Sequence, residues 1–237
     1  IDNANENTWD IKIADRDFSF IKSSYFDLEY VHRIEFDVTN ETQRNTLIQS
    51  SDIVISMLPA HMHIEVAKDC ISAKKHMVTA SYVSPEMRAL ESDAKAAGVI
   101  IVNEIGVDPG IDHLSAKKVI DEILDEGGDL KDFETFTGGL VAPEYDNNPW
   151  NYKFTWNPRN VVLAGQGGAV KFKQEGSYKY IPYNKVFRRT ELIKIDGYGK
   201  FEGYANRDSL KYRTVYGLEN ISTMFRGTLR RPGYCRA

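Results

Sequence analysis

The sequence has little cysteine and no long apolar run, and each shortage excludes a class of protein. Cys70 and Cys235 are the only cysteines among 237 residues. They are too few for a disulfide framework and too far apart in sequence for a metal-binding pair. This usage favours a reducing compartment, and we expect a cytoplasmic protein. No apolar stretch approaches the roughly 20 residues that a membrane helix needs, and the first residues lack the layout of a signal peptide. We therefore expect no membrane partner.

An excess of basic charge is also missing. The net charge is −4 at pH 7, with 30 Lys and Arg against 34 Asp and Glu, so no positive field argues for a nucleic-acid partner. The hydrophobic share of 42% and the charged share of 27% are ordinary for a globular protein. A chain of this length has room for one large or two modest domains.

The first half of the chain alternates strand and helix patterns. Apolar runs end repeatedly in turn-forming residues, and helical spacing fills most of the intervals between them. Such near-continuous apolar strands are typical of a parallel sheet covered on both faces. The expected strands are residues 11–14, 33–38, 52–59, 76–81 and 99–102, and the expected helices are residues 42–49, 63–73, 84 onward and 112–126.

The pattern changes after Leu130. Aromatic, strand-like pieces such as FETFTGGL and YKYIPY alternate with loops that contain Pro and Asn. This pattern indicates a mixed α+β domain with an antiparallel sheet. We therefore predict two domains: a Rossmann-like, doubly wound α/β domain over residues 1–128 and an α+β substrate-binding domain over residues 129–237.

The turn NEIGVDPGIDHLSA, residues 103–116, joins an expected strand to an expected helix. Ligands of doubly wound sheets bind at the carboxyl ends of the strands, so this turn lies where a site is expected. Gly106 and Gly110 permit unusual backbone angles. Asp112 is a plausible helix cap, and Asp108 is one acid more than a cap requires. A simple Gly-Pro turn with a capping acid explains much of the motif, so the turn alone leaves a structural and a functional interpretation evenly matched.

Longer stretches resemble the saccharopine reductases, the glutamate-forming saccharopine dehydrogenases of lysine metabolism. The matching segments follow that family's order and cover nearly all of residues 52–230. They are DIVISMLPAHMH, VTASYVSPEMRALE, AGVIIVNEIGVDPGIDH, GGLVAPEYDNNPWNYKFTW, GYANRDSLKY and RGTLR. The resemblance implies an oxidoreductase acting on a CH–NH bond, which interconverts saccharopine with glutamate plus 2-aminoadipate 6-semialdehyde. It implies NADP as cofactor, with NAD as the alternative, small-molecule substrates and no metal, and it allows a homodimer.

The same resemblance shows what is missing. The family begins with a strand and a Gly-rich turn that holds the cofactor pyrophosphate, and this sequence has no such turn near its start. It also stops at GYCRA, where the family continues. We therefore expect the first domain to be incomplete at its N-terminal end and the second at its C-terminal end. The later cluster AGQGGA, residues 164–169, falls in the substrate domain and is weak evidence for a phosphate site.

The resemblance assigns cofactor contacts residue by residue. Asp15 and Arg16 take the positions that read the adenosine ribose. An acid there usually bonds the ribose 2′-hydroxyl and repels a 2′-phosphate, but the family pattern and Arg16 together favour NADP. The other cofactor positions are Phe36 and Asp37 near the adenine, Met57 and Leu58 near the ribose and pyrophosphate, Ser81, Val107, Asp108 and Pro109 near the nicotinamide, and Trp156 from the substrate domain.

Substrate contacts follow from the same resemblance. Saccharopine is an amine with three carboxylates, so its site needs several donors, and Arg offers a planar fork for carboxylate. An ion pair with Asp208 is the alternative role for Arg207. The carboxylate-binding positions fall on Arg207, Thr228, Leu229 and Arg230.

Ser81, Tyr82 and Asp108 match positions beside both nicotinamide and substrate. Asp108 is expected to stabilise positive charge on the substrate nitrogen, and Tyr82 to orient the substrate or pass a proton. These two are the expected catalytic residues, while most of the chemistry belongs to the cofactor. Thr137 stands where relatives often carry Cys, and we give it no catalytic role because its hydroxyl titrates poorly.

Other interpretations stay open at this stage. His61 and His63 have the spacing of a metal-binding pair, but no third ligand is evident and ordinary hydrogen bonding is favoured. His113 is expected to serve helix packing. A dehydrogenase acting on a polyamine-like or lysine-derived amine is a second function, against which the substrate arginines count. A non-catalytic fragment is a third, supported by the missing Gly-rich turn.

Overall fold

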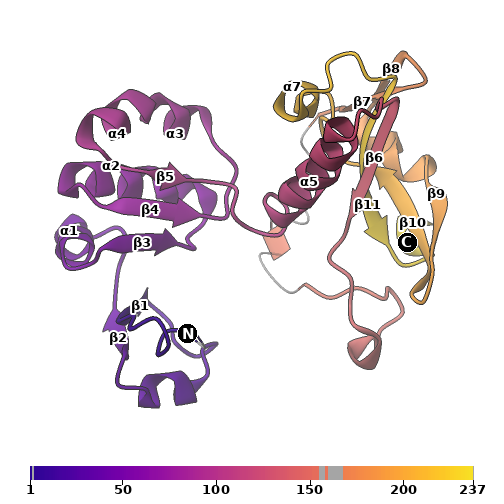
Figure 1. Cartoon of the computed structure of the whole chain (residues 1–237). Coiled ribbons are helices and arrows are strands. Elements are labelled where there is room, and N and C mark those ends of the chain that lie inside the picture. Colours follow the sequence, from indigo (N-terminus) through magenta and orange to yellow (C-terminus); the bar gives the residue numbers. More distant parts are fainter. Residues whose placement is uncertain (2, 155–157, 160–167, 237) are drawn as a thin grey trace. The chain divides into compact units, whose positions relative to one another are not determined.

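The computed structural model (Figure 1) describes residues 1, 3–154, 158–159 and 168–236. The chain divides into two compact units, Ile1–Ile111 and Asp112–Ala237, called unit 1 and unit 2 below. None of the described helices is long and apolar enough to cross a membrane.

Unit 1 contains two small parallel sheets. In the first, β1 (Ile11–Asp15) pairs with β2 (Val31–Glu35). In the second, the strand order is β3 (Ile53–Ser56), β4 (His76–Thr79) and β5 (Ile101–Val102). Parallel neighbours require crossover connections, and the alternating helices of this half supply them. All of these strands lie within or beside the apolar runs that the sequence pattern marked as strands.

The helices of unit 1 begin where the sequence carries capping residues. At the start of α1 (Glu41–Gln49), the Asn40 side chain accepts a hydrogen bond from Gln43 N. At the start of α3 (Pro85–Ala89), the Ser84 side chain accepts one from Met87 N. Such caps satisfy backbone N–H groups that lack a partner within the helix. The helical segments are η1 (Ser23–Asp27), α1 (Glu41–Gln49), η2 (Ala60–Met62), α2 (His63–Ala73), α3 (Pro85–Ala89) and α4 (Glu91–Ala97).

The core of unit 1 lies on one face of the β3–β4–β5 sheet. Met77 in β4 is fully buried against apolar residues of α2, among them Ala67 and Cys70. On β3 the alternate residues Ile53 and Ile55 are 58% and 70% exposed. Successive side chains of a strand point to opposite faces, and among the described residues the helices of unit 1 bury only one face of β3.

Unit 2 is built on one mixed sheet beside a long helix, α5 (Ile111–Asp125). The strand β11 pairs antiparallel with β10 and β7, and parallel with β6; β7 also pairs with β8, and β10 with β9. The strands are β6 (Asp132–Thr137), β7 (Val170–Gln174), β8 (Ser177–Ile181), β9 (Glu191–Ile195), β10 (Gly199–Ala205) and β11 (Thr223–Arg230). The shorter helical segments are η3 (Pro143–Tyr145), η5 (Tyr183–Arg188), α7 (Tyr212–Tyr216) and η6 (Tyr234–Arg236).

The predicted fold class is confirmed: parallel strands with crossover helices come first, and a largely antiparallel sheet follows. The predicted domains, residues 1–128 and 129–237, leave α5 with the first domain. In the structure Ile120 of α5 is 1% exposed and packs in a cluster with Tyr212, Tyr216 and Met224 of unit 2. The exact domain boundary stays a prediction, because compactness does not by itself show which segments fold together.

Asp112 also ties α5 to the sheet of unit 2. It is the second residue of α5 and not its cap, so the predicted capping role is wrong. Its Oδ2 accepts a hydrogen bond of 2.8 Å from Nη2 of Arg226 in β11, and both side chains are 6% exposed. Burial of one charge without the other is costly, so this acid of the turn motif serves the packing of unit 2.

Candidate functional site

The candidate site of unit 1 lies at the carboxyl edge of the β3–β4–β5 sheet. Parallel strands end at the same edge, so the residues that follow them gather there. Ser56 ends β3, Ser81 and Tyr82 follow β4, and the turn of residues 103–110 follows β5.

Tyr82 and Asp108 meet at this edge. The Tyr82 hydroxyl donates a hydrogen bond of 2.9 Å to Oδ1 of Asp108, although 26 residues separate them. Both residues were predicted from the resemblance to stand beside the substrate, and the structure brings them together. A phenol held against a carboxylate gives a site one negative charge and one oriented hydroxyl.

Backbone hydrogen bonds hold the turn in this place. Glu104 N donates to Ser81 O at 3.1 Å, and the Glu104 carboxylate accepts from Val83 N at 3.0 Å. Glu104 therefore joins the turn to the segment after β4 through two hydrogen bonds. Since that segment carries Tyr82, these bonds also hold Tyr82 near Asp108.

Gly110 explains why the turn contains glycine. Its φ is +149°, and a Cβ there would lie 2.1 Å from Gly106 O. The close approach lets Gly106 N donate to Pro109 O at 2.8 Å and Ile111 N donate to Gly106 O at 2.9 Å. No side chain fits between these backbones, so the loop that carries Asp108 depends on this residue.

At the end of β1, Arg16 is held by an acid. Its Nη2 lies 2.5 Å from Oδ1 of Asp37, and the two side chains are 63% and 41% exposed. Hydrogen bonds from Thr39, and then the Arg16 guanidinium, lower the pKa of Asp37 to about 2. Asp15 accepts a hydrogen bond from Asp17 N at 3.0 Å. Arg16 and Asp37, both predicted to contact the adenosine end of the cofactor, thus form an ion pair with each other.

The other predicted cofactor residues are spread along the same unit. Met57 and Val107 are 78% and 68% exposed, as a ligand contact requires. Leu58 instead packs against the core cluster of α2. Phe36 follows β2, its backbone N–H donating to Asp15 O at 3.1 Å, and Pro109 follows Asp108 through a cis peptide bond. Trp156 lies outside the described residues.

One functional candidate was missed by sequence reasoning. His63, 2% exposed at the start of α2, makes hydrogen bonds of 2.8 Å with Ser56 Oγ and with Ser81 Oγ. Burial and then the nearby His61 lower the pKa of His63. The sequence showed only the spacing of His61 and His63. The hydrogen-bond partners of His63 are Ser56, which ends β3, and Ser81, which follows β4.

In unit 2, Arg230 contacts two neighbouring aromatic rings, whose centres lie 5.5 Å apart. Its guanidinium carbon is 5.1 Å from the ring centre of Tyr152 and 5.2 Å from that of Tyr234. Its Nη1 donates to Leu229 O at 3.0 Å, and its buried Nε has no hydrogen-bond partner among the described residues. Such ring contacts restrict the orientation of a guanidinium while leaving its edge for an anion. Tyr152 lies in one of the segments that carry the family resemblance, but neither Tyr152 nor Tyr234 was predicted as a site residue.

Arg207 shares its surroundings with Arg230. Burial and the neighbouring Tyr234 raise the pKa of Tyr183, and both Arg207 and Arg230 oppose that rise. The positive charges of both guanidinium groups are therefore close enough to Tyr183 to favour its ionised form. Asp208, the alternative partner considered for Arg207, lies 3.5 Å from Lys171 Nζ.

The remaining predicted substrate residues lie on β11. Thr228 pairs with Tyr204 of β10 on one side and with Thr137 of β6 on the other. Thr137, the residue in the place of the family's Cys, is thus next to Thr228 in the sheet. Leu229 is 7% exposed, so its side chain belongs to the core.

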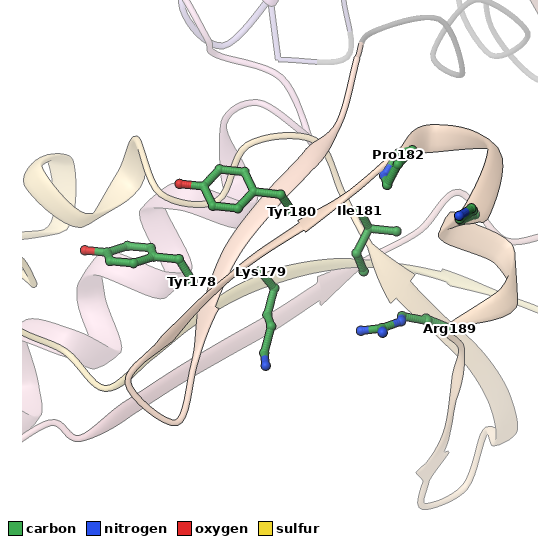
Figure 2. Close-up of a pocket in the computed structure, with 7 residues that line it drawn as sticks. Tyr178, Lys179, Tyr180, Ile181, Pro182 and Arg189 are labelled. Atoms are coloured by element: carbon green, nitrogen blue, oxygen red, sulfur yellow. The ribbon is translucent and has the colours of Figure 1, made fainter.

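A surface hollow of about 420 Å³ in unit 2 is separate from these residues. In Figure 2, Tyr178 and Tyr180 point to one side of β8 and Lys179 to the other. None of its lining residues was predicted as a site residue. They are Tyr178, Lys179, Tyr180, Ile181, Pro182, Lys185 and Arg189.

Comparison with known proteins decides the family. Residues 2–102 match the family model of the saccharopine dehydrogenase NADP binding domain, and residues 106–237 match that of the saccharopine dehydrogenase C-terminal domain. The chain belongs to the saccharopine dehydrogenase family. The resemblance inferred from the sequence is confirmed.

Individual members of the saccharopine dehydrogenase family agree. The chain is 41% identical over 202 residues to saccharopine dehydrogenase (NADP(+), L-glutamate-forming) of Saccharomyces cerevisiae, covering 85% of this chain and 45% of that protein. It is 41% identical over 207 residues to the alpha-aminoadipic semialdehyde synthase of Arabidopsis thaliana, covering 86% of this chain and 19% of that protein. The chain therefore spans less than half of each.

A solved structure supports the same conclusion. The chain matches apo histidine-tagged saccharopine dehydrogenase (L-Glu forming) from Saccharomyces cerevisiae with a TM-score of 0.86 and 36% identity, covering 95% of this chain and 50% of that one.

Proposed function

We propose that the full-length protein interconverts saccharopine and water with glutamate and 2-aminoadipate 6-semialdehyde, with NADP as the hydride carrier. The observation that carries the proposal is the 2.9 Å hydrogen bond between Tyr82 and Asp108. It lies at the strand edge where doubly wound sheets bind ligands; Tyr82 falls in the residues that match an NADP binding domain, and Asp108 in those that match the C-terminal domain of the same family. The glutamate-forming reaction is the one named for the yeast relative.

The residues of unit 1 fit an NADP cofactor at its two ends. Arg16 follows β1 and exposes 63% of its side chain, so it can reach a phosphate on the ribose. Ser81, Val107 and Asp108 would stand near the nicotinamide, which supplies or accepts the hydride when the cofactor is bound. The protein's part is placement and electrostatics.

Asp108 and Tyr82 have distinct roles in the proposed reaction. Loss of hydride from the carbon beside the secondary amine leaves positive charge on the nitrogen, and the Asp108 carboxylate stabilises that charge. Tyr82, oriented by Asp108, directs the amine or carries a proton to or from it. Water then adds to the C=N bond, and breakage of the C–N bond gives the amine of glutamate and the aldehyde.

The arginines of unit 2 suit a substrate with several carboxylates. Arg230 contacts the rings of Tyr152 and Tyr234. Arg207 and Arg230 both oppose the rise in the pKa of Tyr183, so their positive charges lie near the same phenol. Thr228 adds a hydroxyl on the same strand. Arg–carboxylate pairs are among the stronger charged hydrogen bonds, so these residues favour saccharopine over a polyamine.

The test is a reaction of the purified full-length protein with saccharopine, followed by NADPH absorbance and by chromatographic detection of glutamate. We expect both products in equal amounts, and no turnover of spermidine or lysine. Turnover of either amine with none of saccharopine would contradict the proposal. No turnover of any of the three, despite NADPH binding, would favour a non-catalytic role.

Two further points belong to this proposal. Both Cys70 and Cys235 are free thiols, which supports a cytoplasmic, reducing location. The homodimer stays a prediction that light scattering of the full-length protein would test.

A further inference from the structure

His63 joins the ends of two strands at the candidate site. Its Nδ1 lies 2.8 Å from Ser56 Oγ, the last residue of β3. Its Nε2 lies 2.8 Å from Ser81 Oγ, two residues beyond β4, and 3.2 Å from Thr79 Oγ1. Both ring nitrogens are therefore occupied, one by each strand end.

The surroundings keep this bridge in one arrangement. Ser56, His63 and Thr79 are 5%, 2% and 1% exposed, whereas Ser81 is only half-buried. The imidazole stands in the first turn of α2, where the helix dipole disfavours a positive ring. Burial, and then His61, also lower the pKa of His63. A neutral ring has one N–H donor and one acceptor, so the hydrogen bond to Ser56 determines what the ring offers to Ser81.

We propose that His63 is a positioning residue, which holds the Ser81 hydroxyl at the carboxyl edge of the sheet and is itself oriented by Ser56. A free serine hydroxyl samples three staggered rotamers, and the contact with His63 selects one of them. One side of the Ser81 hydroxyl is then used by the ring, and the other is left for a polar group of the cofactor or substrate. This role of Ser81 rests on the proposed function, but the bridge itself does not.

The first experiment measures the bridge without any ligand. In protein labelled at histidine and serine, NMR shows the tautomer of His63 from its nitrogen shifts and the Ser81 rotamer from its Hα–Hβ couplings. We expect one neutral tautomer between about pH 5 and 8, where an ordinary histidine titrates, and one Ser81 rotamer. In Ser56→Ala and His63→Gln we expect several Ser81 rotamers. Equal couplings in the wild type and both variants would overturn the proposal.

The second experiment measures what the bridge does in the proposed reaction. Ser56→Ala leaves Ser81 and every predicted ligand contact intact. We expect it to lower kcat with saccharopine about tenfold with KM nearly unchanged, since misplacement of a site group acts on the reacting geometry. Ser51→Ala is the matched control. Its hydroxyl bonds Leu47 O at 2.9 Å just before β3, away from the site, and we expect wild-type kcat.

The two experiments separate the possible failures. A lower melting temperature in Ser56→Ala with wild-type kcat would show a purely structural bridge and overturn the positioning role. A double variant of Ser56→Ala and Ser81→Ala should be no slower than Ser81→Ala alone, because the two residues act through one contact. If the wild type does not turn over saccharopine, the proposed function fails, and the couplings of Ser81 alone decide the positioning role.

Discussion

The hydroxyl of Tyr82 donates a 2.9 Å hydrogen bond to the carboxylate of Asp108. The first residue follows β4 and the second lies in the turn after β5, so the contact exists only because parallel strands end at a common edge. Glu104 fastens the turn to the segment that carries Tyr82. The pair thus has a fixed geometry before any ligand binds, which is the property that electrostatic catalysis requires.

Asp108→Asn should leave the fold intact and lower kcat with saccharopine by about 10²-fold or more, the range reported for loss of one preorganised polar group. Asn keeps the shape and can still accept from Tyr82, but it loses the charge that stabilises a positive nitrogen. Tyr82→Phe should lower kcat less, because the charge remains. Steady-state kinetics and circular dichroism check both variants. Unfolding of Asp108→Asn, or wild-type kcat in it, would show that the acid is only structural.

Arg230→Ala should weaken saccharopine binding by about 1.5–3 kcal/mol, the contribution of a charged hydrogen bond, which is roughly tenfold to over a hundredfold in Kd. Arg207→Ala should act in the same direction. Calorimetric titration with saccharopine, and separately with NADPH, checks this, and NADPH affinity should hardly change. Exposed Arg188 of η5 offers the control Arg188→Ala. If saccharopine binds both site variants as it binds the wild type, the substrate assignment is wrong.

Asp37→Asn should raise the preference for NADPH over NADH. Asp37 now holds the Arg16 guanidinium at 2.5 Å, so a 2′-phosphate must compete with it, and removal of the charge frees Arg16 for phosphate. Asp15→Ala should act in the same direction by removing repulsion. The measurement is the ratio of kcat/KM for the two cofactors. A wild-type preference for NADH that Asp15→Ala reverses would show that the acid, and not Arg16, sets the choice.

Gly110→Ala should destabilise unit 1 by more than about 3 kcal/mol or displace the turn, because its Cβ would lie 2.1 Å from Gly106 O. Gly98→Ala is the matched control. Gly98 also has a positive φ, +70°, but nothing lies within 4 Å of its added Cβ, so only the backbone preference of about 1 kcal/mol is lost. Urea unfolding measures both. Equal costs would mean that the turn yields easily and does not fix Asp108.

Much of the candidate site could be proposed from the sequence because it consists of short, contiguous motifs. The run of residues 103–116 and the strand ends before Ser81 are local patterns, and parallel strands place their ends together by a general rule. The exposed Ile53 and Ile55 could not be predicted, because an apolar run does not show which of its faces is covered. Asp112 was mistaken for a cap, because its partner Arg226 is distant in sequence.

The sequence by itself determined the alternation of strands and helices in the first half of the chain and the family, since these follow from periodicity and from contiguous residue identities. The tertiary structure alone decided the pairings across the chain. His63 with Ser56 and Ser81, and Arg16 with Asp37, are contacts between side chains of different segments. No local pattern encodes them, because a hydrogen bond or ion pair depends on the distance and direction of its groups, and only the packed fold sets these.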